Sequence, residues 1–527
     1  MTTRLVADGR HTGVTPGKYS VGSVRVVNSV TAEHGGITRR GLLTAGLAAA
    51  AGTVAVTGLV TALPTTRATT PARTPRTIAE AGALLRSGRV TSVQLTRTAL
   101  DAAAKLQPQI NAFITVTTQQ ALDTAARLDA ELARGADRGP LHGIPVVFKD
   151  LYSTAGVLTS VGSRVFAERV PAEDAAVVTK LVQAGAVSIG KTNLNEFAAG
   201  IDGKNVYYGD IHNPLRPDRS AGGSSSGTGA AVAAGIVAAG VGSDTGGSLR
   251  VPAAWNGVVG IRPTHGLVSL YGAFPRAPRF DVAGPLGRTV HDTAVMLAAM
   301  AGHDPRDPYS RPAPKSDYLA DLDRGVAGLR IGLIEDFSLT GLDPDVEAAV
   351  RRVLPVLERL GARVTTVKIE NLATMLDFTA AFTILRWEFA QAMRDVYGAA
   401  PDKSVFGPTV RADMEAAGKL TRADYDAATA RRFSDAAPMR AALDEVDLLL
   451  TPTMPTVAPR LDTRSDEFVR GRRYTIPFTY ADLPSISVPC GRGAQGLPVA
   501  LQFASREFDE ALLFRAAAEI ERQTRDW

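Results

Sequence analysis

Short β-like runs alternate with amphipathic helical runs through most of this chain, and that order restricts the fold more than any other feature of the sequence. A β-like run at 145–148 precedes a helical run at 174–184, and a second β-like run follows at 187–189. Such alternation is typical of layered α/β domains. The same periodicities predict helices at 77–106, 117–134, 228–239, 290–301, 344–360 and 510–525, and strands at 329–334, 363–369, 446–450, 486–489 and 497–503.

The end of the chain again supplies strands and a closing helix, and no internal repeat is found. Strands and helices from both the early and the late parts of residues 77–527 are therefore needed to complete one hydrophobic core. We expect residues 77–527 to form a single large α/β domain. Its central sheet should be mixed, mostly parallel and twisted, with helices covering both faces.

The distribution of charge and the cysteine content exclude several classes of protein. The formal net charge is +5, but residues 1–68 hold seven of the 58 Lys and Arg residues and only two of the 53 Asp and Glu residues. The rest of the chain has 51 residues of each sign, so it lacks the overall positive charge typical of nucleic-acid-binding proteins. The single cysteine, Cys490, excludes an internal disulfide. No histidines fall at metal-binding spacing, and we expect no metal or other cofactor.

Residues 1–68 resemble a twin-arginine export signal, because Arg39 and Arg40 directly precede an uncharged run that extends to Leu63. This run is about long enough to span a bilayer, so a retained membrane anchor is the alternative. We expect residues 1–68 to be a leader and residues 69–76 a linker. The protein should then be periplasmic, bound to the cell surface or secreted, with a membrane-anchored or cytoplasmic location as the alternative.

Residues Gly185–Thr192 match the pattern of a phosphate-binding P-loop letter for letter. In a P-loop, the residues between the two glycines form a loop that follows a strand. Here residues 186–189 are themselves β-prone and follow a helical run. The surrounding pattern therefore argues against a nucleotide site.

The run Gly223–Gly227 fits the nucleophile elbow G-x-S-x-G, which would make Ser225 the centre of a Ser-His-Asp triad. In hydrolases with this elbow, the histidine is the last triad member along the chain. The last histidine here is His303, and strands and helices of the predicted domain still follow it. The segment before the elbow, 213–219, is turn-forming rather than an apolar strand. Both observations disfavour a histidine-based triad.

A Gly/Ser-rich block extends from Ala221 to Pro252. Such composition also occurs in flexible linkers. Here, however, the glycines bracket an apolar Ala/Val/Ile segment, which predicts an ordered loop, helix, strand and second loop. In the second loop, glycines beside Ser248 allow backbone amides to converge on one point, as an oxyanion hole requires. Ser248 is therefore a candidate nucleophile.

A serine hydroxyl needs a base to become nucleophilic, and with histidine disfavoured the remaining candidate is a buried lysine. Lys149 ends the β-like run that begins at Gly143, which would carry it into the interior. Burial disfavours the ammonium form and lowers the pKa of a lysine towards neutrality. A lysine at an exposed strand end is an equally good interpretation of these residues, so both stay open at this point.

Together these segments resemble the amidase signature family. The resemblance is carried by Gly143–Asp150, by Ala221–Gly227 and by Gly242–Arg250. It covers roughly residues 77–525, through shorter matches at 190–197, 257–264, 284–290, 451–455, 487–491 and 496–502. The P-loop match falls inside this pattern and needs no nucleotide to explain it.

The resemblance implies that three residues carry the chemistry. Ser248 would be the acylated nucleophile, Ser224 would relay protons and Lys149 would be the final base, with Ser225 hydrogen-bonded nearby. Such a Ser-Ser-Lys triad forms an acyl-enzyme, which water then hydrolyses. The choice of Ser224 over Ser225 depends on the resemblance alone.

The resemblance also implies how the nucleophile loop stabilises a negative charge. The oxyanion hole would consist of the backbone amides of Thr245, Gly246, Gly247 and Ser248, and Asp244 and Arg250 would support the loop. Arg262 and Leu267 depart from the residues that are usual in the family. We expect these two departures to affect peripheral packing only.

The implied function is that of a serine hydrolase that cleaves carboxylic amides to an acid and an amine or ammonia. The same residues could also cleave esters or carbamates. Specialisation as a urethanase, which cleaves carbamates, or as an aryl acylamidase, which cleaves anilides, is a further alternative. The alternative is the glutaminase subunit of glutamyl-tRNA(Gln) amidotransferase, which the run Ala301–Asp307 also resembles. The expected partner is a small-molecule amide, with no nucleic acid and with a membrane only during export. A homodimer is left open.

In this family variable segments build the substrate pocket, and we expect them here at 158–163, 374–389 and 472–480. Aromatic side chains in these segments would suit an apolar acyl or aryl group, namely Phe378, Phe382, Trp387, Tyr474, Phe478 and Tyr480. Ordinary core packing is the other interpretation of the same residues.

Overall fold

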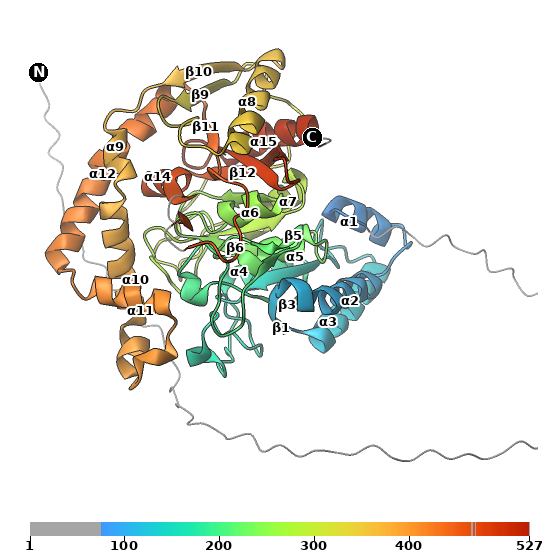
Figure 1. Ribbon diagram of the computed structural model, residues 1–527. Coiled ribbons are helices and arrows are strands. Elements are labelled where there is room, and N and C mark those ends of the chain that lie inside the picture. The colour runs from blue at the N-terminus through green and yellow to red at the C-terminus, as the bar shows by residue number, and fades with distance from the viewer. Residues whose placement is uncertain (1–74, 465–466, 469–470, 526–527) are drawn as a thin grey trace, which may run out of the picture. The chain divides into compact units, whose positions relative to one another are not determined.

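Eleven strands form the main sheet, and two more form a short ribbon, within residues 75–464, 467–468 and 471–525, the part of the chain that this computed structural model describes (Figure 1). The ribbon pairs β4 (His212–Asn213) with β5 (Arg216–Ser220). The main sheet contains, in spatial order, β1 (Phe113–Val116), β3 (Val187–Thr192), β2 (Pro145–Lys149), β6 (Ala239–Asp244), β8 (Val282–Gly287), β7 (Val259–Arg262), β12 (Ser485–Arg492), β13 (Pro498–Ala504), β11 (Leu448–Pro452), β9 (Arg330–Ile334) and β10 (Arg363–Val367).

The sheet is mixed, as predicted. Its parallel pairs lie in two blocks, β3-β2-β6 and β11-β9-β10. The strands between these blocks pair antiparallel, and so do β1 and β3. One reason is that β13 follows β12 after a short turn, a connection that only antiparallel neighbours can use. The parallel pairing that the alternation of helices and strands predicts is therefore confined to the two flanks of the sheet.

Helices lie along the sheet, and α9 to α12 form a group at one side of it (Figure 1). The helices predicted at 174–184, 290–301 and 344–360 are confirmed to within two residues at each end. The α-helices are α1 (Ile78–Arg86), α2 (Ser92–Ile110), α3 (Thr118–Ala133), α4 (Ala176–Gln183), α5 (Ser226–Ala233), α6 (Arg250–Asn256), α7 (Val290–Met300), α8 (Pro344–Arg359), α9 (Leu372–Leu376), α10 (Thr379–Ala399), α11 (Pro408–Ala417), α12 (Arg422–Glu445), α14 (Ile476–Tyr480) and α15 (Glu510–Thr524).

Strand β2 shows why helices cover both faces of the sheet. Successive side chains of a strand point to opposite faces. Val146 and Phe148 pack in a hydrophobic cluster with residues of α4, α7 and α15, whereas Val147 packs in a second cluster with residues of α2, α3 and α5. All three side chains are fully buried. The apolar run that predicted a strand therefore anchors two helical layers at once.

The helical run predicted at 77–106 is two helices, α1 and α2, separated by a turn. Gly88 has a φ of +67°, which favours glycine and ends the first helix. Thr91 then caps the second helix, and Gln94 completes the capping box. The sequence pattern predicted a single helix because the apolar residues of both helices recur at similar spacing and the pattern does not change at the turn.

The helix predicted at 228–239 ends earlier, because Gly235 has a φ of +74° and the chain turns there. Ala239 instead begins β6. The segment 213–219, expected as a turn, forms the β4–β5 ribbon with its turn between the two strands. Both differences lie beside the Gly/Ser-rich block, where short elements leave little periodicity to detect.

The predicted leader at 1–68 and most of the predicted linker at 69–76 lie outside the described residues. The described residues all belong to one compact unit, 73–527. Within it, none of the helices has both the length and the apolar character needed to cross a membrane.

Candidate active site

Lys149 ends strand β2 and is fully buried between β3 and β6. Its Nζ donates hydrogen bonds to Ser224 Oγ at 2.7 Å, Ser243 Oγ at 2.9 Å and Ser225 Oγ at 3.1 Å. Burial lowers the pKa of Lys149 to about 7, although two nearby carboxylates oppose the shift. The interpretation of Lys149 as an exposed lysine at a strand end is therefore wrong, and the amine can exchange a proton near neutral pH.

Ser224 and Ser225 occupy the turn before α5. The peptide bond between Gly223 and Ser224 is cis. A Cβ atom on Gly223 would lie 2.2 Å from the side-chain oxygen of an asparagine, so only glycine fits at this position. The amide of Ser225 donates to the carbonyl of Ser248 at 3.3 Å, and its hydroxyl donates to the carbonyl of Ser243 at 3.1 Å. The turn that holds Ser224 is therefore a direct neighbour of the loop that holds Ser248.

One buried carboxylate organises the nucleophile loop, residues 244–250. Asp244 accepts hydrogen bonds from the amides of Gly247 at 2.7 Å and Leu249 at 3.2 Å, and it forms an ion pair with Arg250 at 3.0 Å. Burial raises the pKa of this carboxyl, but Arg250 and Arg262 outweigh that effect and bring the pKa of Asp244 to about 2. Asp244 is therefore ionised at neutral pH and fixes the curve of the loop.

The sequence predicts that the amide of Gly247 contributes to the oxyanion hole, but the structure gives that amide another partner, the carboxylate of Asp244. Within the described part of the chain, the amides of Gly246 and Ser248 make no hydrogen bond, so they are free to meet a negative charge. Gly247 still shapes the loop, because its φ is +126° and a Cβ there would lie 2.6 Å from Thr475 Oγ1. Its role is conformational.

The sequence did not reveal the roles of two buried residues beside the nucleophile loop, Arg262 and Asp281. Arg262 is 1% exposed and donates to the carbonyl oxygens of Asp244 and Phe280, each at 2.8 Å. The expectation that its departure from the family pattern is peripheral is therefore wrong. Asp281 accepts a hydrogen bond from Thr245 Oγ1 at 2.5 Å. Neither role follows from a sequence motif, because each depends on how β7 and β8 pair with β12 and β6.

The two rejected motifs have structural roles. Lys191 of the P-loop pattern is fully buried in strand β3, where its Nζ donates to the carbonyl of Tyr152 at 2.7 Å and lies 3.3 Å from a carboxylate oxygen of Asp150. The strand predicted within that pattern is confirmed. Ser225 of the elbow pattern is bound to Lys149 and Ser243 rather than to a histidine.

A family model described as Amidase matches residues 94–514 of the chain. The chain belongs to the amidase family. The A subunit of glutamyl-tRNA(Gln) amidotransferase from Anaeromyxobacter dehalogenans is 39% identical to this amidase over 470 residues, which cover 85% of this chain and 96% of that protein. The resemblance to amidase signature enzymes that the motifs indicated is therefore confirmed.

Solved structures agree with the sequence comparison. The peptide amidase of Stenotrophomonas maltophilia superposes with a TM-score of 0.77 at 34% identity, covering 85% of this amidase and 97% of that chain. The A subunit of glutamyl-tRNA(Gln) amidotransferase from Thermotoga maritima gives a TM-score of 0.72 at 32% identity, covering 85% and 94%. The single α/β domain expected from the sequence is the fold of these enzymes.

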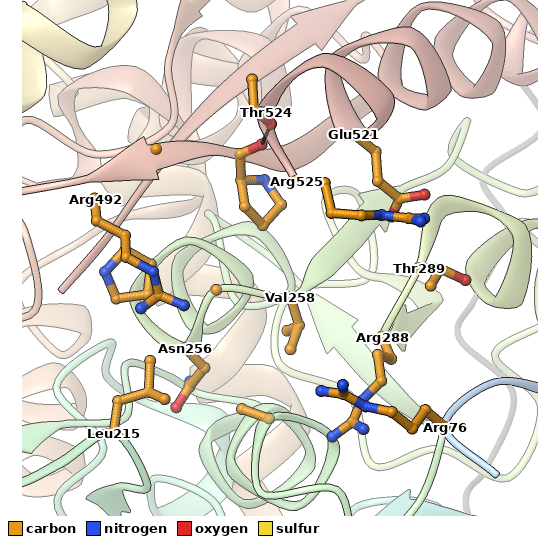
Figure 2. Close-up of a pocket in the computed structure, with 15 residues that line it drawn as sticks. Arg76, Leu215, Asn256, Val258, Arg288, Thr289, Arg492, Glu521, Thr524 and Arg525 are labelled. Carbon is orange, nitrogen blue, oxygen red and sulfur yellow. Dashed lines mark hydrogen bonds between the residues drawn. The ribbon is translucent and has the colours of Figure 1, made fainter. Parts of the chain in front are cut away.

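This amidase has a pocket of about 390 Å³ (Figure 2). It is lined by Val258, just before β7, and by Arg288, just after β8. Asp244 and Arg262 lie at the other ends of this part of the sheet, because they end β6 and β7. The pocket is therefore not where Ser248 would meet a carbonyl group.

Asp244→Asn should lower the free energy of unfolding of this amidase by about 3–5 kcal/mol, because two buried guanidinium groups lose their carboxylate partner. The contribution of Asp244 depends on pH. Its pKa is lowered to about 2 in the folded protein, so its stabilisation is present above the pKa of the unfolded carboxyl and is lost as the pH falls towards 2. Urea unfolding at neutral and acidic pH measures both effects.

The matched control is Asp426→Asn, which removes only the exposed pair between Asp426 and Arg422 on α12. Its effect on the free energy of unfolding should stay below about 0.5 kcal/mol. If the two variants lose similar amounts of stability, Asp244 does not organise the nucleophile loop.

Proposed function

We propose that this amidase hydrolyses carboxylic amides through an acyl-enzyme on Ser248. The observation that carries the proposal is the 2.7 Å hydrogen bond between Lys149 Nζ and Ser224 Oγ inside a fully buried cluster of hydroxyls. Neutral Lys149 has a lone pair that accepts the proton of Ser224, and Ser224 in turn takes the proton of Ser248. In this scheme the lysine and the relay serine replace the histidine of other serine hydrolases.

Both halves of the reaction use the same relay. As Ser248 attacks the carbonyl carbon, the amides of Gly246 and Ser248 stabilise the oxyanion, with Thr245 beside them. The proton held by Lys149 returns through Ser224 to the leaving nitrogen, so that the amine or ammonia departs neutral. Water then attacks the ester on Ser248 and releases the acid. Esters and carbamates present the same carbonyl group and fall within this chemistry.

A narrower function is favoured by the comparisons, that of the glutaminase subunit of a glutamyl-tRNA(Gln) amidotransferase. The amidotransferase A subunits from Anaeromyxobacter dehalogenans and Chromohalobacter salexigens are 39% and 40% identical to this chain, over 85% and 86% of its length. In that role the chain would release ammonia from a primary carboxamide and act with partner subunits. Export by the predicted leader would separate it from charged tRNA, so the two proposals compete.

Two assays of the purified chain distinguish these functions. One measures ammonia release from L-glutamine, and the other measures 4-nitroaniline release from an acyl 4-nitroanilide. A free-standing amidase should hydrolyse the anilide by itself. The glutaminase subunit should favour glutamine and should gain activity with its partner subunits. In both cases added hydroxylamine should intercept the acyl-enzyme and give a hydroxamate. If no amide is hydrolysed and no hydroxamate forms, the proposed chemistry is rejected.

A further inference from the structure

Three arginines from distant parts of the chain gather around one carboxylate; we call Arg276, Arg386 and Arg472 the arginine cluster. Asp413 on α11 forms ion pairs with Arg276 and, at 3.4 Å, with Arg386 on α10. Arg472 begins the short 3-10 helix η4 (Arg472–Tyr474). Burial lowers the pKa of Arg472, Asp413 opposes the shift, and Arg276 and Arg386 add to it. Arg276 and Arg386 share Asp413, and Arg386 and Arg472 lie over the same aromatic ring, that of Phe382, so the three guanidinium groups are close together.

Hydrogen bonds place the arginine cluster on two sides of the nucleophile loop. On one side, the amide of Arg276 and the hydroxyl of Thr245 both donate to the carboxylate of Asp281, at 2.8 Å and 2.5 Å. On the other side, the carbonyl of Arg472 accepts from the amide of Thr475 at 3.1 Å, and the hydroxyl of Thr475 donates to a loop carbonyl at 2.8 Å. A group bound by the cluster would therefore lie near Ser248.

Two guanidinium nitrogens of the arginine cluster lack a hydrogen-bond partner among the described residues, Nη1 of Arg276 and Nε of Arg472. Arg276 is only 6% exposed, so water does not replace the missing acceptor readily. Its guanidinium lies 3.7 Å over the ring of Phe389, and those of Arg386 and Arg472 lie 5.3 Å and 5.6 Å from the ring of Phe382. Aromatic rings hold the groups in place but accept no ordinary hydrogen bond from these nitrogens.

The other nearby carboxylates do not complete the arginine cluster. Asp281 directs its oxygens to the Thr245 hydroxyl and to the amides of Arg276 and Ala277. Asp202 accepts hydrogen bonds from the side chain of Asn195 and the amide of Lys204. Buried donors without acceptors are costly, and like charges repel more strongly away from water. The cluster is therefore short of an anionic acceptor.

We propose that the arginine cluster binds a carboxylate of the substrate, so that the amides hydrolysed at Ser248 carry an anionic group. This inference rests on the proposed amide hydrolysis and narrows its substrate class. A carboxylate accepts two parallel hydrogen bonds from a guanidinium group, and Arg386, whose side chain is 40% exposed, can offer them. The added negative charge offsets the repulsion among the three guanidinium groups. The carboxylate can belong to the acyl part, as in a monoamide of a dicarboxylic acid, or to the amine part, as in an N-acyl amino acid. The same charges disfavour an ammonium group at this position.

Two matched pairs of substrates test the inference on the full chain. Glutaryl 4-nitroanilide is compared with pentanoyl 4-nitroanilide for the acyl part, and pentanoyl 4-aminobenzoate with pentanoyl 4-aminoacetophenone for the amine part. In one pair, kcat/KM should be about tenfold to a hundredfold higher for the carboxylate-bearing member. Equal values within both pairs overturn the inference and leave amide hydrolysis standing. Failure to hydrolyse any of the four overturns the proposed function instead.

Substitutions in the arginine cluster test whether these arginines cause the preference for a carboxylate-bearing substrate. Arg276→Gln and Arg386→Gln should each lower the kcat/KM ratio of the favoured pair about tenfold. Arg386 is 40% exposed, so its variant serves if Arg276→Gln does not fold. The matched control is Arg394→Gln on the same helix. The Arg394 side chain is 73% exposed and pairs with Asp395 at 3.0 Å. A ratio that stays at the wild-type value in both cluster variants, or that falls equally in the control, contradicts the inference.

Discussion

Ser248→Ala should reduce amide and ester turnover by at least about 10⁴-fold, because the variant lacks the oxygen that would form the acyl-enzyme. The loop should keep its shape, since the contact that Ser248 makes to Ser225 uses its carbonyl oxygen rather than its side chain. Steady-state kinetics with a 4-nitroanilide and a 4-nitrophenyl ester would measure the loss. Thermal unfolding of the same samples would show that the fold is intact.

The chain offers a matched serine for the control. Ser226 follows Ser224 and Ser225, is fully buried, and its hydroxyl has no hydrogen-bond partner in the described part of the structure. Ser226→Ala should therefore keep turnover within about twofold, in line with a substitution that removes no interaction. Undiminished hydrolysis by Ser248→Ala would move the nucleophile elsewhere, and Ser225 would be the first residue to test.

Lys149→Met should lower kcat/KM by about 10³-fold, because the remaining serines have no group to accept their proton. In the wild-type enzyme, kcat/KM should fall about tenfold per pH unit below pH 7, since the pKa of Lys149 is lowered to about 7 and only the neutral amine accepts a proton. A pH profile of both proteins with one anilide measures the two effects. A wild-type profile that stays flat from pH 5 to about 8 would exclude Lys149 as the base.

The same lowered pKa has a consequence for stability that activity assays do not detect. The unfolded lysine takes up a proton near its ordinary pKa of 10.5, whereas the folded one does so only near 7. Between these values the unfolded state binds more protons, so the stability of the wild type should decrease as the pH falls from 10.5 to 7. Lys149→Met should lack this component of the pH dependence, which urea unfolding in that range would show.

Local chemistry explains which parts of the fold could be predicted from the sequence. The strand at 145–149 and the helix at 344–359 follow from runs of apolar residues at the spacing of their own element. Breaks such as the one at Gly88 were missed, because a positive φ ends a helix without interrupting the apolar spacing. Strands β7 and β8 were missed because glycine interrupts β7, and glycine and proline interrupt β8, residues that are typical of turns and loops in a sequence.

In the candidate site, too, some residues could be predicted from the sequence and others could not. Ser248 could be predicted because glycines beside a serine allow amides to converge, whereas the burial of Lys149 depends on the neighbouring strands and stayed open. The hydrogen bond from the amide of Gly247 to Asp244 depends on the orientation of one side chain, and no sequence pattern encodes that orientation. The arginine cluster is harder still, because Arg276 and Arg472 belong to segments that meet only in the folded chain.

Strands β12 and β13 lie in the middle of the sheet, between β7 and β11, although they are the last strands along the chain. Arg250 likewise obtains three of its hydrogen-bond partners, Thr475, Thr479 and Gln502, from residues beyond 470. During synthesis, a nascent chain that has not yet released residue 504 leaves the nucleophile loop without these supports. We therefore expect hydrolytic activity to appear only after the chain has been synthesised through residue 504 and β13 has paired with its neighbours.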